Sequence, residues 1–222
     1  MEIKILPVNR GTLAGYSTIP SYVEVNSTLD VKTLEGFGGI TFSEKKVKKP
    51  YLKNYDEHGE PFSWLNFNTS NWVMFIMQDG ERPAGGLTMA CKTPELRILS
   101  GRDDLADIWD IRVRPDLKRQ GIGTNLFTRA IEWCRSEGYK QLCVETQNVN
   151  VPACRFYLKQ GCNLGVINRY AYRAAPAIEL EVPANLNFEP RPGPVFEQLV
   201  VFVVSQPRSL EQMIVPAVVG VE

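Results

Sequence analysis

The sequence predicts a mixed α/β domain of the α+β class. Apolar runs of strand length occur at the start and in the middle of the chain, two segments with helical spacing separate the later strands, and glycine or proline marks the element ends. With 222 residues, 44% hydrophobic and 23% charged, the chain can form one or at most two globular domains with a core.

The first part of the chain predicts an antiparallel start. Residues 2–6 are expected to form a strand, the polar region that follows up to about Val31 to hold one short helix, and residues 37–43 to form a second strand. Residues 44–64 are expected to form a long irregular connection, in which the basic run KKVKK (residues 45–49) is a solvated charged face.

The middle of the chain predicts a hairpin and a further strand. Residues 72–77 and 85–91 are apolar and are joined through Asp79-Gly80, a strong turn signal. Another strand is expected over residues 105–113, ending at Arg114-Pro115.

Two helices alternate with strands after this point. Residues 121–137 carry apolar side chains at spacings of four, which predicts an amphipathic helix that stops at Gly138. A short buried strand is expected over 141–146, and a second helix over 150–160, where Asn150 suits the N-cap and Pro152 the first turn. Strands are also expected over 163–173 and, after a Pro-rich stretch, over 197–204.

Composition excludes several functional classes. Lys plus Arg equals Asp plus Glu at 25 each, so no global field favours nucleic acid or an anionic membrane. No run of eighteen or more apolar residues and no signal-peptide pattern occurs, so we expect a cytoplasmic protein. Five cysteines without metal-ligand spacing predict reduced, buried thiols and no metal, and the single histidine, His58, predicts a solvated turn residue.

A glycine-containing turn leads directly from the strand 105–113 into the first helix. Gly121 and Gly123 let main-chain N–H groups approach an anion, and the positive end of the helix dipole lies behind them. Lys118 and Arg119 add side-chain cations, which makes a diphosphate a suitable guest. The turn is neither a Walker loop nor the dinucleotide fingerprint, because GK[ST] and the third glycine are missing. A helix that merely begins with flexible glycines, and a nucleotide site, are the alternatives.

This turn and the downstream segment NVNVPACRFYLKQGC together resemble the acetyl-CoA-binding core of the GNAT superfamily of N-acetyltransferases. In that family a [QR]xxGxG[AG] turn wraps the CoA pyrophosphate, and an NxxAxxFYxKxGF helix presents a tyrosine to the leaving sulfur. The sequence departs from these patterns at Lys118, Thr124 and Cys162. We expect the first two changes to weaken phosphate geometry only slightly, and the third to affect packing.

Longer stretches resemble streptothricin acetyltransferases and their GNAT relatives, over about residues 19–172. They are KKPYLKNYDE, ADIWDIRVRPDLKRQGIG and VETQNVNVPACRFYLKQGCNLGVINRYAY. The resemblance implies a GNAT-type fold, in which a central, mostly antiparallel sheet is splayed between two parallel strands and flanked by helices. Residues after Ala174 match the pattern poorly.

The resemblance also implies acetyl-CoA as co-substrate, and names the residues that would bind it. Two would act through their main chain, Ile111 and Val113, and the others are Lys118, Arg119, Gln120, Gly121, Ile122, Gly123, Thr124, Asn150, Ala153 and Phe156. Tyr157 would protonate the CoA sulfur as a tetrahedral intermediate collapses, its alternative role being that of a core aromatic.

The general base is open between Asp107, Asp110 and a water chain. Strand alternation predicts that the two carboxylates face opposite sides of the sheet, so that at most one meets the substrate. Either could instead be a solvated or ion-paired carboxylate. Four aromatic residues are candidates for lining an acceptor pocket or for simple packing: Trp109, Trp64, Tyr51 and Tyr55.

The function that the resemblance implies is transfer of acetyl from acetyl-CoA to a primary amine of a small molecule, such as a streptothricin-like antibiotic. The alternatives are a protein N-terminal or lysine acetyltransferase and a non-catalytic CoA-binding module. We expect a single domain over residues 1–204, with the acetyl-CoA core at about 105–173 and a tail over 205–222. The Pro-rich insertion and the apolar tail MIVPAVVGVE also suggest a homodimer.

Overall fold

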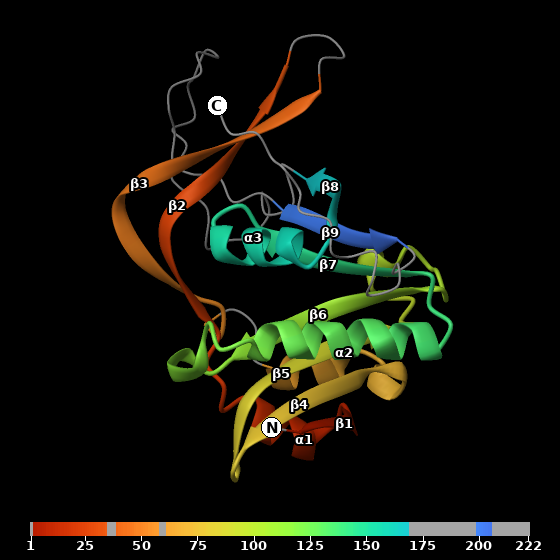
Figure 1. The fold of residues 1–222 in the computed structure, drawn as a ribbon. Coiled ribbons are helices and arrows are strands. Elements are labelled where there is room, and N and C mark those ends of the chain that lie inside the picture. The colour runs from red at the N-terminus through yellow and green to blue at the C-terminus, as the bar shows by residue number, and fades with distance from the viewer. Residues whose placement is uncertain (1, 35–38, 58–60, 169–198, 206–222) are drawn as a thin grey trace, which may run out of the picture.

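The computed structural model describes residues 2–34, 39–57, 61–168 and 199–205. Within these residues, a seven-stranded sheet has the order β1-β4-β5-β6-β7-β9-β8, and β2 and β3 form a separate two-stranded ribbon (Figure 1). The strands are β1 (Ile3–Pro7), β2 (Tyr22–Thr33), β3 (Ile40–Asn54), β4 (Val73–Asp79), β5 (Arg82–Cys91), β6 (Leu105–Val113), β7 (Gln141–Gln147), β8 (Asn163–Asn168) and β9 (Leu199–Ser205). The α-helices are α1 (Arg10–Tyr16), α2 (Ile122–Ser136) and α3 (Val151–Lys159).

The sheet is mixed, which confirms the predicted fold class. Strands β1, β4, β5 and β6 pair antiparallel, β6 and β7 pair parallel, and β9 pairs antiparallel with both β7 and β8. The parallel step needs a crossover, and α2 supplies it between β6 and β7.

The parallel strands β6 and β7 separate along their length. Their pairing begins at Leu105↔Gln141 and ends at Ile108↔Val144, whereas β6 continues to Val113. The last part of β6 therefore pairs with β5 on one side and leaves the edge towards β7 open. This is the splay that the resemblance predicted, and it places unpaired main-chain groups next to α2 and α3.

Helices cover both faces of the sheet. α2 and α3 pack on one face (Figure 1), where α2 buries Leu126, Phe127 and Ala130 almost completely. α1 and short 3-10 turns cover the other face with a second core that includes Leu13 and Tyr16. Full burial of a large apolar side chain contributes roughly 1.5–3 kcal/mol, so these two cores hold the sheet between them.

Most predicted elements are confirmed, and the largest error lies in the ribbon. The sequence predicted no strand before residue 31 other than 2–6, yet β2 spans Tyr22–Thr33, and β3 extends to Asn54 through residues predicted to be irregular. The ribbon is exposed over much of its length, so its strands lack the alternation of apolar and polar residues that reveals a half-buried strand.

The structure also bears on the predictions for the cysteines, for the strand after α3 and for membrane-spanning segments. All five cysteines are free and buried, as predicted. Of the strand predicted over 163–173, β8 accounts for the part up to Asn168. His58, residues 169–198 and the apolar tail lie outside the described residues. In the part of the chain that the structure describes, no helix is both long and apolar enough to cross a membrane.

Candidate active site

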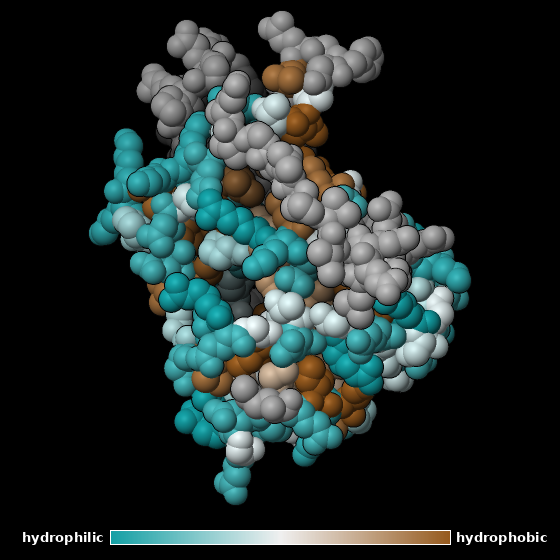
Figure 2. Space-filling model, in the orientation of Figure 1, coloured by the Kyte–Doolittle hydropathy of each residue, from teal (hydrophilic) through white to brown (hydrophobic). Residues whose placement is uncertain are grey.

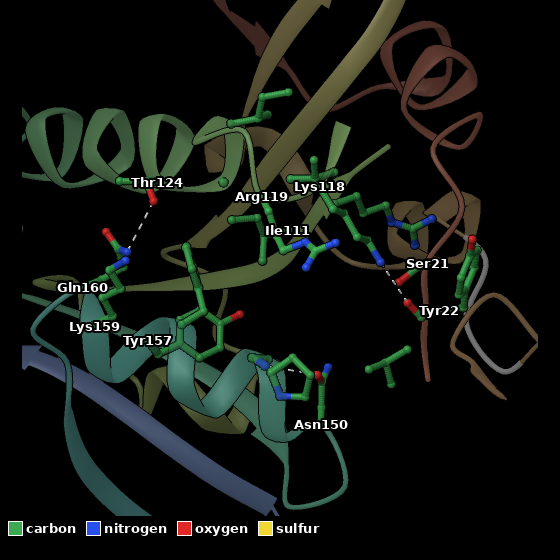
Figure 3. A pocket seen from close by; sticks show the side chains of 18 of the residues that line it. Ser21, Tyr22, Ile111, Lys118, Arg119, Thr124, Asn150, Tyr157, Lys159 and Gln160 are labelled. Atoms are coloured by element: carbon green, nitrogen blue, oxygen red, sulfur yellow. Dashed lines mark hydrogen bonds between the residues drawn. The ribbon is translucent and has the colours of Figure 1, made fainter. Parts of the chain in front are cut away.

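A cavity of about 680 Å³ lies where β6 and β7 separate. Figure 2 shows the hollow on the face that carries α2 and α3, and Figure 3 shows the side chains that surround it. Its wall comes from five parts of the chain: the start of β2, Tyr55 after β3, the end of β6, the turn into α2, and α3. Segments more than 100 residues apart in sequence therefore meet at one site.

The turn before α2 is built to present main-chain donors. Gly121 has φ +84 and is the N-cap of α2, and Arg119 has φ +65. Both values lie in the left-handed region, which glycine adopts at least cost. The first N–H groups of α2, like those of any helix, have no acceptor within the helix, and no side chain caps them, so they are available at the cavity, at the positive end of the dipole. This arrangement suits an anion such as a phosphate.

The side chains of the turn are placed differently from one another. Lys118 and Arg119 line the cavity, and Nζ of Lys118 donates to the main-chain oxygen of Tyr22 at 3.4 Å (Figure 3). The same ammonium lies 5.1 Å from the ring centroid of Tyr22. Gln120 does not line the cavity, because its amide turns back to donate to the carbonyl of Asp116 at 3.3 Å.

Helix α3 forms the opposite wall. Asn150 is its N-cap and accepts from the N–H of Ala153 at 3.2 Å, and both residues line the cavity. Gln160 at the other end donates to the hydroxyl of Thr124 at 3.5 Å, which links α3 to the first turn of α2 (Figure 3). Gly123 faces the ring of Phe156, and a Cβ there would lie 3.6 Å from it, in ordinary van der Waals contact.

Tyr157 presents its hydroxyl to this cavity from α3, as Figure 3 shows. Its ring packs among aromatic side chains, 6.2 Å from Phe127 and 5.3 Å from Phe156 between centroids, and only 4% of the residue is exposed. Burial, helped by the negative charge of Asp110, raises the pKa of Tyr157 well above its ordinary value. The phenol is therefore protonated at neutral pH and available as a proton donor.

Asp110 belongs to a polar cluster beside the cavity. Its Oδ2 accepts from the hydroxyl of Tyr16 at 2.9 Å and from Nε of Arg112 at 2.5 Å. Burial raises the pKa of Asp110, while the guanidinium of Arg112 acts in the opposite direction. The side chain of Asp110 is 20% exposed.

Asp107 has a different environment. It is 2% exposed, does not line the cavity, and accepts from the thiol of Cys143 at 3.2 Å. Burial raises its pKa to about 7.

The prediction that Asp107 and Asp110 face opposite sides of the sheet is wrong. The pairing of β5 with β6 shifts between Thr88↔Asp110 and Met89↔Ile108, which leaves Trp109 as a bulge. The extra residue places both carboxylates on the face of the sheet that α1 covers. There Asp110 contacts Tyr16 and Asp107 contacts Cys143, and both of these partners belong to the core under α1, called the α1-side core below.

The structure brings most of the predicted site residues together. The cavity is lined by Ile111, Val113, Lys118, Arg119, Gly121, Ile122, Gly123, Thr124, Asn150, Ala153, Phe156 and Tyr157. The exceptions are Gln120, Asp107 and Asp110, and of these Asp110 reaches the wall through its contact with Arg112, which does line it.

Several lining residues were not predicted. Pro20, Ser21, Tyr22 and Val23 come from the start of β2, a strand that the sequence does not reveal. Among the four aromatic candidates for an acceptor pocket, Tyr55 does line the cavity. Trp64 and Trp109 instead pack in or against the α1-side core, and Tyr51 is 42% exposed on the ribbon. The signal for Arg112 was present: an arginine inside an apolar strand needs buried partners.

Comparison with known proteins identifies the fold and its relatives. The model of the "Acetyltransferase (GNAT) family" matches residues 42–162. Streptothricin acetyltransferase A of Bacillus subtilis (strain 168) is 28% identical over 139 residues, which cover 63% of this chain and 74% of that protein. A streptothricin acetyltransferase of Escherichia coli is 33% identical over 87 residues, which cover 39% of this chain and half of that protein.

A solved structure shares the fold over nearly the full length. It is a protein assigned as a streptothricin acetyltransferase from Bacillus anthracis str. Ames, in complex with acetyl coenzyme A. The TM-score is 0.66 at 20% identity, and the match covers 92% of this chain and 99% of that one.

Proposed function

Because the chain belongs to the GNAT family of acetyltransferases, we propose that it transfers acetyl from acetyl-CoA to a primary amine of a small molecule, with streptothricin as the first candidate acceptor. The names of its relatives support the acceptor, since two of them are streptothricin acetyltransferases. The size of the cavity, about 680 Å³, supports a small-molecule site. Strand β9 lies between β7 and β8 in the sheet, which supports one domain extending to about residue 204.

We infer that acetyl-CoA lies with its pyrophosphate at the start of α2. Gly121, Ile122, Gly123 and Thr124 offer main-chain N–H groups there, and Lys118 and Arg119 offer positive charge. Gln120 contributes only main chain, because its side chain turns away. The pantetheine arm follows the open edge of β6 at Ile111 and Val113, and Asn150, Ala153 and Phe156 form the opposite wall.

The chemistry needs a polarised thioester, a neutral amine and a proton for the leaving thiolate. The main-chain N–H of Ile111 donates to the thioester oxygen as the amine nitrogen attacks the carbonyl carbon. Tyr157 donates its proton to the sulfur as the carbon–sulfur bond breaks, which leaves free CoA and an amide. The high pKa of Tyr157 suits this role, because the group stays protonated until the thiolate forms.

Asp110 is the better placed of the two carboxylates to receive the ammonium. It is partly exposed and next to the cavity-lining Arg112, whereas Asp107 is enclosed in the core next to Cys143. A negative charge there attracts the cationic acceptor, and the amine proton leaves through Asp110 or through water bound to it.

One observation carries the proposal: the uncapped start of α2 and the hydroxyl of Tyr157 border the same cavity at the open edge of β6. An assay of CoA thiol release from acetyl-CoA, run with streptothricin, lysine, polyamines and peptides, tests it. We expect rapid release with streptothricin or another small amine and slow release with peptides. Rapid release with peptides alone indicates a protein acetyltransferase, and binding of acetyl-CoA without transfer to any amine indicates a non-catalytic module.

A further inference from the structure

Arg112 on β6 is an almost fully buried arginine whose guanidinium contacts several polar groups. Its side chain is 3% exposed, yet its Nε contacts Asp110 at 2.5 Å and one terminal nitrogen contacts Asp56 at 2.7 Å. The same terminal nitrogen donates to the carbonyl of Ile19 at 3.0 Å, and the guanidinium carbon lies 5.3 Å from the ring centroid of Tyr16. A guanidinium in so enclosed a place is stable only with such partners.

These partners belong to three separate segments. Asp110 is on β6, Ile19 lies between α1 and β2, and Asp56 lies after the end of β3. Asp56 also accepts the main-chain N–H of Ser21 at 2.9 Å. Arg112 therefore holds residues 19–21, directly through Ile19 and indirectly through Asp56, and links them to the strand that borders the cofactor cavity.

Residues 20–23 and Tyr55 form the part of the cavity wall that belongs neither to β6, nor to the phosphate turn, nor to α3. With the cofactor placed along β6, this wall is the part left for the acceptor. The cluster of Arg112 with Asp110 and Asp56 has one positive and two negative groups, and its exposed surface is carboxylate: 20% of Asp110 and 31% of Asp56 are exposed. Such a surface attracts an ammonium group.

We propose that Arg112 is a positioning residue for acetyl transfer, because its guanidinium holds residues 19–21 and Asp56 against Asp110 and so fixes where the acceptor amine lies relative to the thioester. The inference rests on the proposed function. Through its ion pair with Arg112, Asp56 also affects how tightly a cationic acceptor binds.

The geometry requires arginine rather than any cation. Nε donates to Asp110, while one terminal nitrogen donates to Asp56 and to the carbonyl of Ile19, so the planar guanidinium binds all three partners at once. A lysine at this position keeps the positive charge but has one nitrogen, and it would lose at least one of the links.

The test compares Arg112→Lys, Arg112→Met and Asp56→Asn with Arg114→Lys. Arg114 is the matched control, because it also holds two carboxylates, Asp79 and Asp116, but these are 48% and 64% exposed and Arg114 does not line the cavity. Steady-state kinetics with streptothricin and acetyl-CoA give separate KM values for the two substrates. Thermal unfolding shows whether each variant folds. If Arg112→Met does not fold, the kinetics of Arg112→Lys and Asp56→Asn still test the proposal.

Arg112→Lys is expected to raise the acceptor KM by about tenfold or more and the acetyl-CoA KM by less than about twofold. Asp56→Asn is expected to have a smaller effect in the same direction, of about threefold, and to add little in the Arg112→Lys background, because both act through one link. Arg114→Lys is expected to leave both KM values within about twofold of the wild type.

A pH profile separates positioning from charge. The titratable and charged groups around Asp110 are Arg112 on its own strand, Tyr16 from α1, Asp56 after β3, and Tyr157 from α3. Arg112→Met removes the only cation among them, so the pKa of Asp110 rises and the acidic limb of kcat/KM moves to higher pH. Arg112→Lys keeps the charge, so the limb stays near its wild-type position while the acceptor KM is raised.

The outcomes distinguish the inference from the proposed function. A wild-type protein that binds acetyl-CoA and acetylates no amine overturns both. A wild-type protein that is active, with an Arg112→Lys variant whose acceptor KM is unchanged or rises no more than its acetyl-CoA KM, overturns the role of Arg112 alone.

Discussion

The hydroxyl of Tyr16 donates a hydrogen bond of 2.9 Å to Asp110, which lies 94 residues further along the chain. Tyr16 ends α1 and is completely buried on the sheet, so the bond ties the N-terminal helix to the strand beside the cavity. The approach is possible because residue 86, directly beneath the ring, is glycine. A Cβ at that position would lie 2.6 Å from Cε2 of Tyr16.

Gly86→Ala should therefore destabilise the protein and lower its activity. The added methyl group would also meet Ile76 at 2.9 Å, so both neighbours would have to move, at a cost of about 1–3 kcal/mol. Denaturant unfolding measures this cost. Gly15→Ala in α1 is the control, because a Cβ there has nothing within 4 Å and alanine favours the helix. Equal unfolding midpoints for Gly86→Ala and the wild type would contradict the packing described for Tyr16.

Tyr157→Phe should lower kcat by about 100-fold or more, because it removes the proton donor to the leaving sulfur. The ring contacts with Phe127 and Phe156 are retained, so the fold and the KM for acetyl-CoA should change little. Tyr139→Phe is the matched control, since Tyr139 stacks on Trp133 at 5.6 Å and does not line the cavity. Turnover by Tyr157→Phe at the wild-type rate would show that the proton comes from elsewhere.

Gly121→Ala should weaken acetyl-CoA binding by about tenfold. Its φ of +84 is costly for alanine, by about 1 kcal/mol, and relaxation of the strain would turn the N–H groups of the turn away from the phosphates. Gly138→Ala makes a matched control, because Gly138 has φ +81 at the far end of α2 and a Cβ there also meets nothing within 4 Å. We expect the two variants to lose similar stability, but only Gly121→Ala to lose affinity for CoA in a calorimetric titration. Equal affinities of the two variants for CoA would contradict the assignment of the turn.

Asp107→Asn should stabilise the protein increasingly as the pH rises from about 4 to 7, and by a constant amount above that. The pKa of Asp107 is about 7 in the folded state, against 3.8 for the unfolded carboxyl, so the folded state binds more protons between these values. Wild-type stability contributed by this group is therefore present at low pH and is lost as the pH rises through 7. Asparagine has no charge to bury and can still accept from Cys143. Melting temperatures at several pH values test this, and a constant difference between the two proteins across the range would show that Asp107 is not held protonated.

The parts of the fold that the sequence predicts best are those with one buried face. α2 repeats its apolar residues every four positions and fills the core with them, and Asn150 caps α3 through its side chain, so both helices begin within about a residue of the predicted positions. β6 matches its predicted bounds because it is buried over most of its length.

Two features had no local signal. The ribbon of β2 and β3 is held by strand pairing and by contacts such as the main-chain bond of 2.9 Å from Leu29 to Asn148, and its exposed faces carry no hydrophobic period. The bulge at Trp109 depends on how β5 pairs with β6, and no residue type at that position specifies it. For this reason the prediction that Asp107 and Asp110 face opposite sides of the sheet was wrong. The cavity wall over residues 20–23 could not be predicted because it includes the start of β2.

The central claim is that the start of α2 and Tyr157 act on the two ends of one acetyl-CoA molecule. A crystal structure of the protein soaked with acetyl-CoA tests this most directly. The account predicts the pyrophosphate on the main-chain N–H groups of residues 121–124 and the thioester sulfur within hydrogen-bonding distance of the Tyr157 hydroxyl. A cofactor bound away from this turn, or a sulfur out of reach of Tyr157, would contradict it.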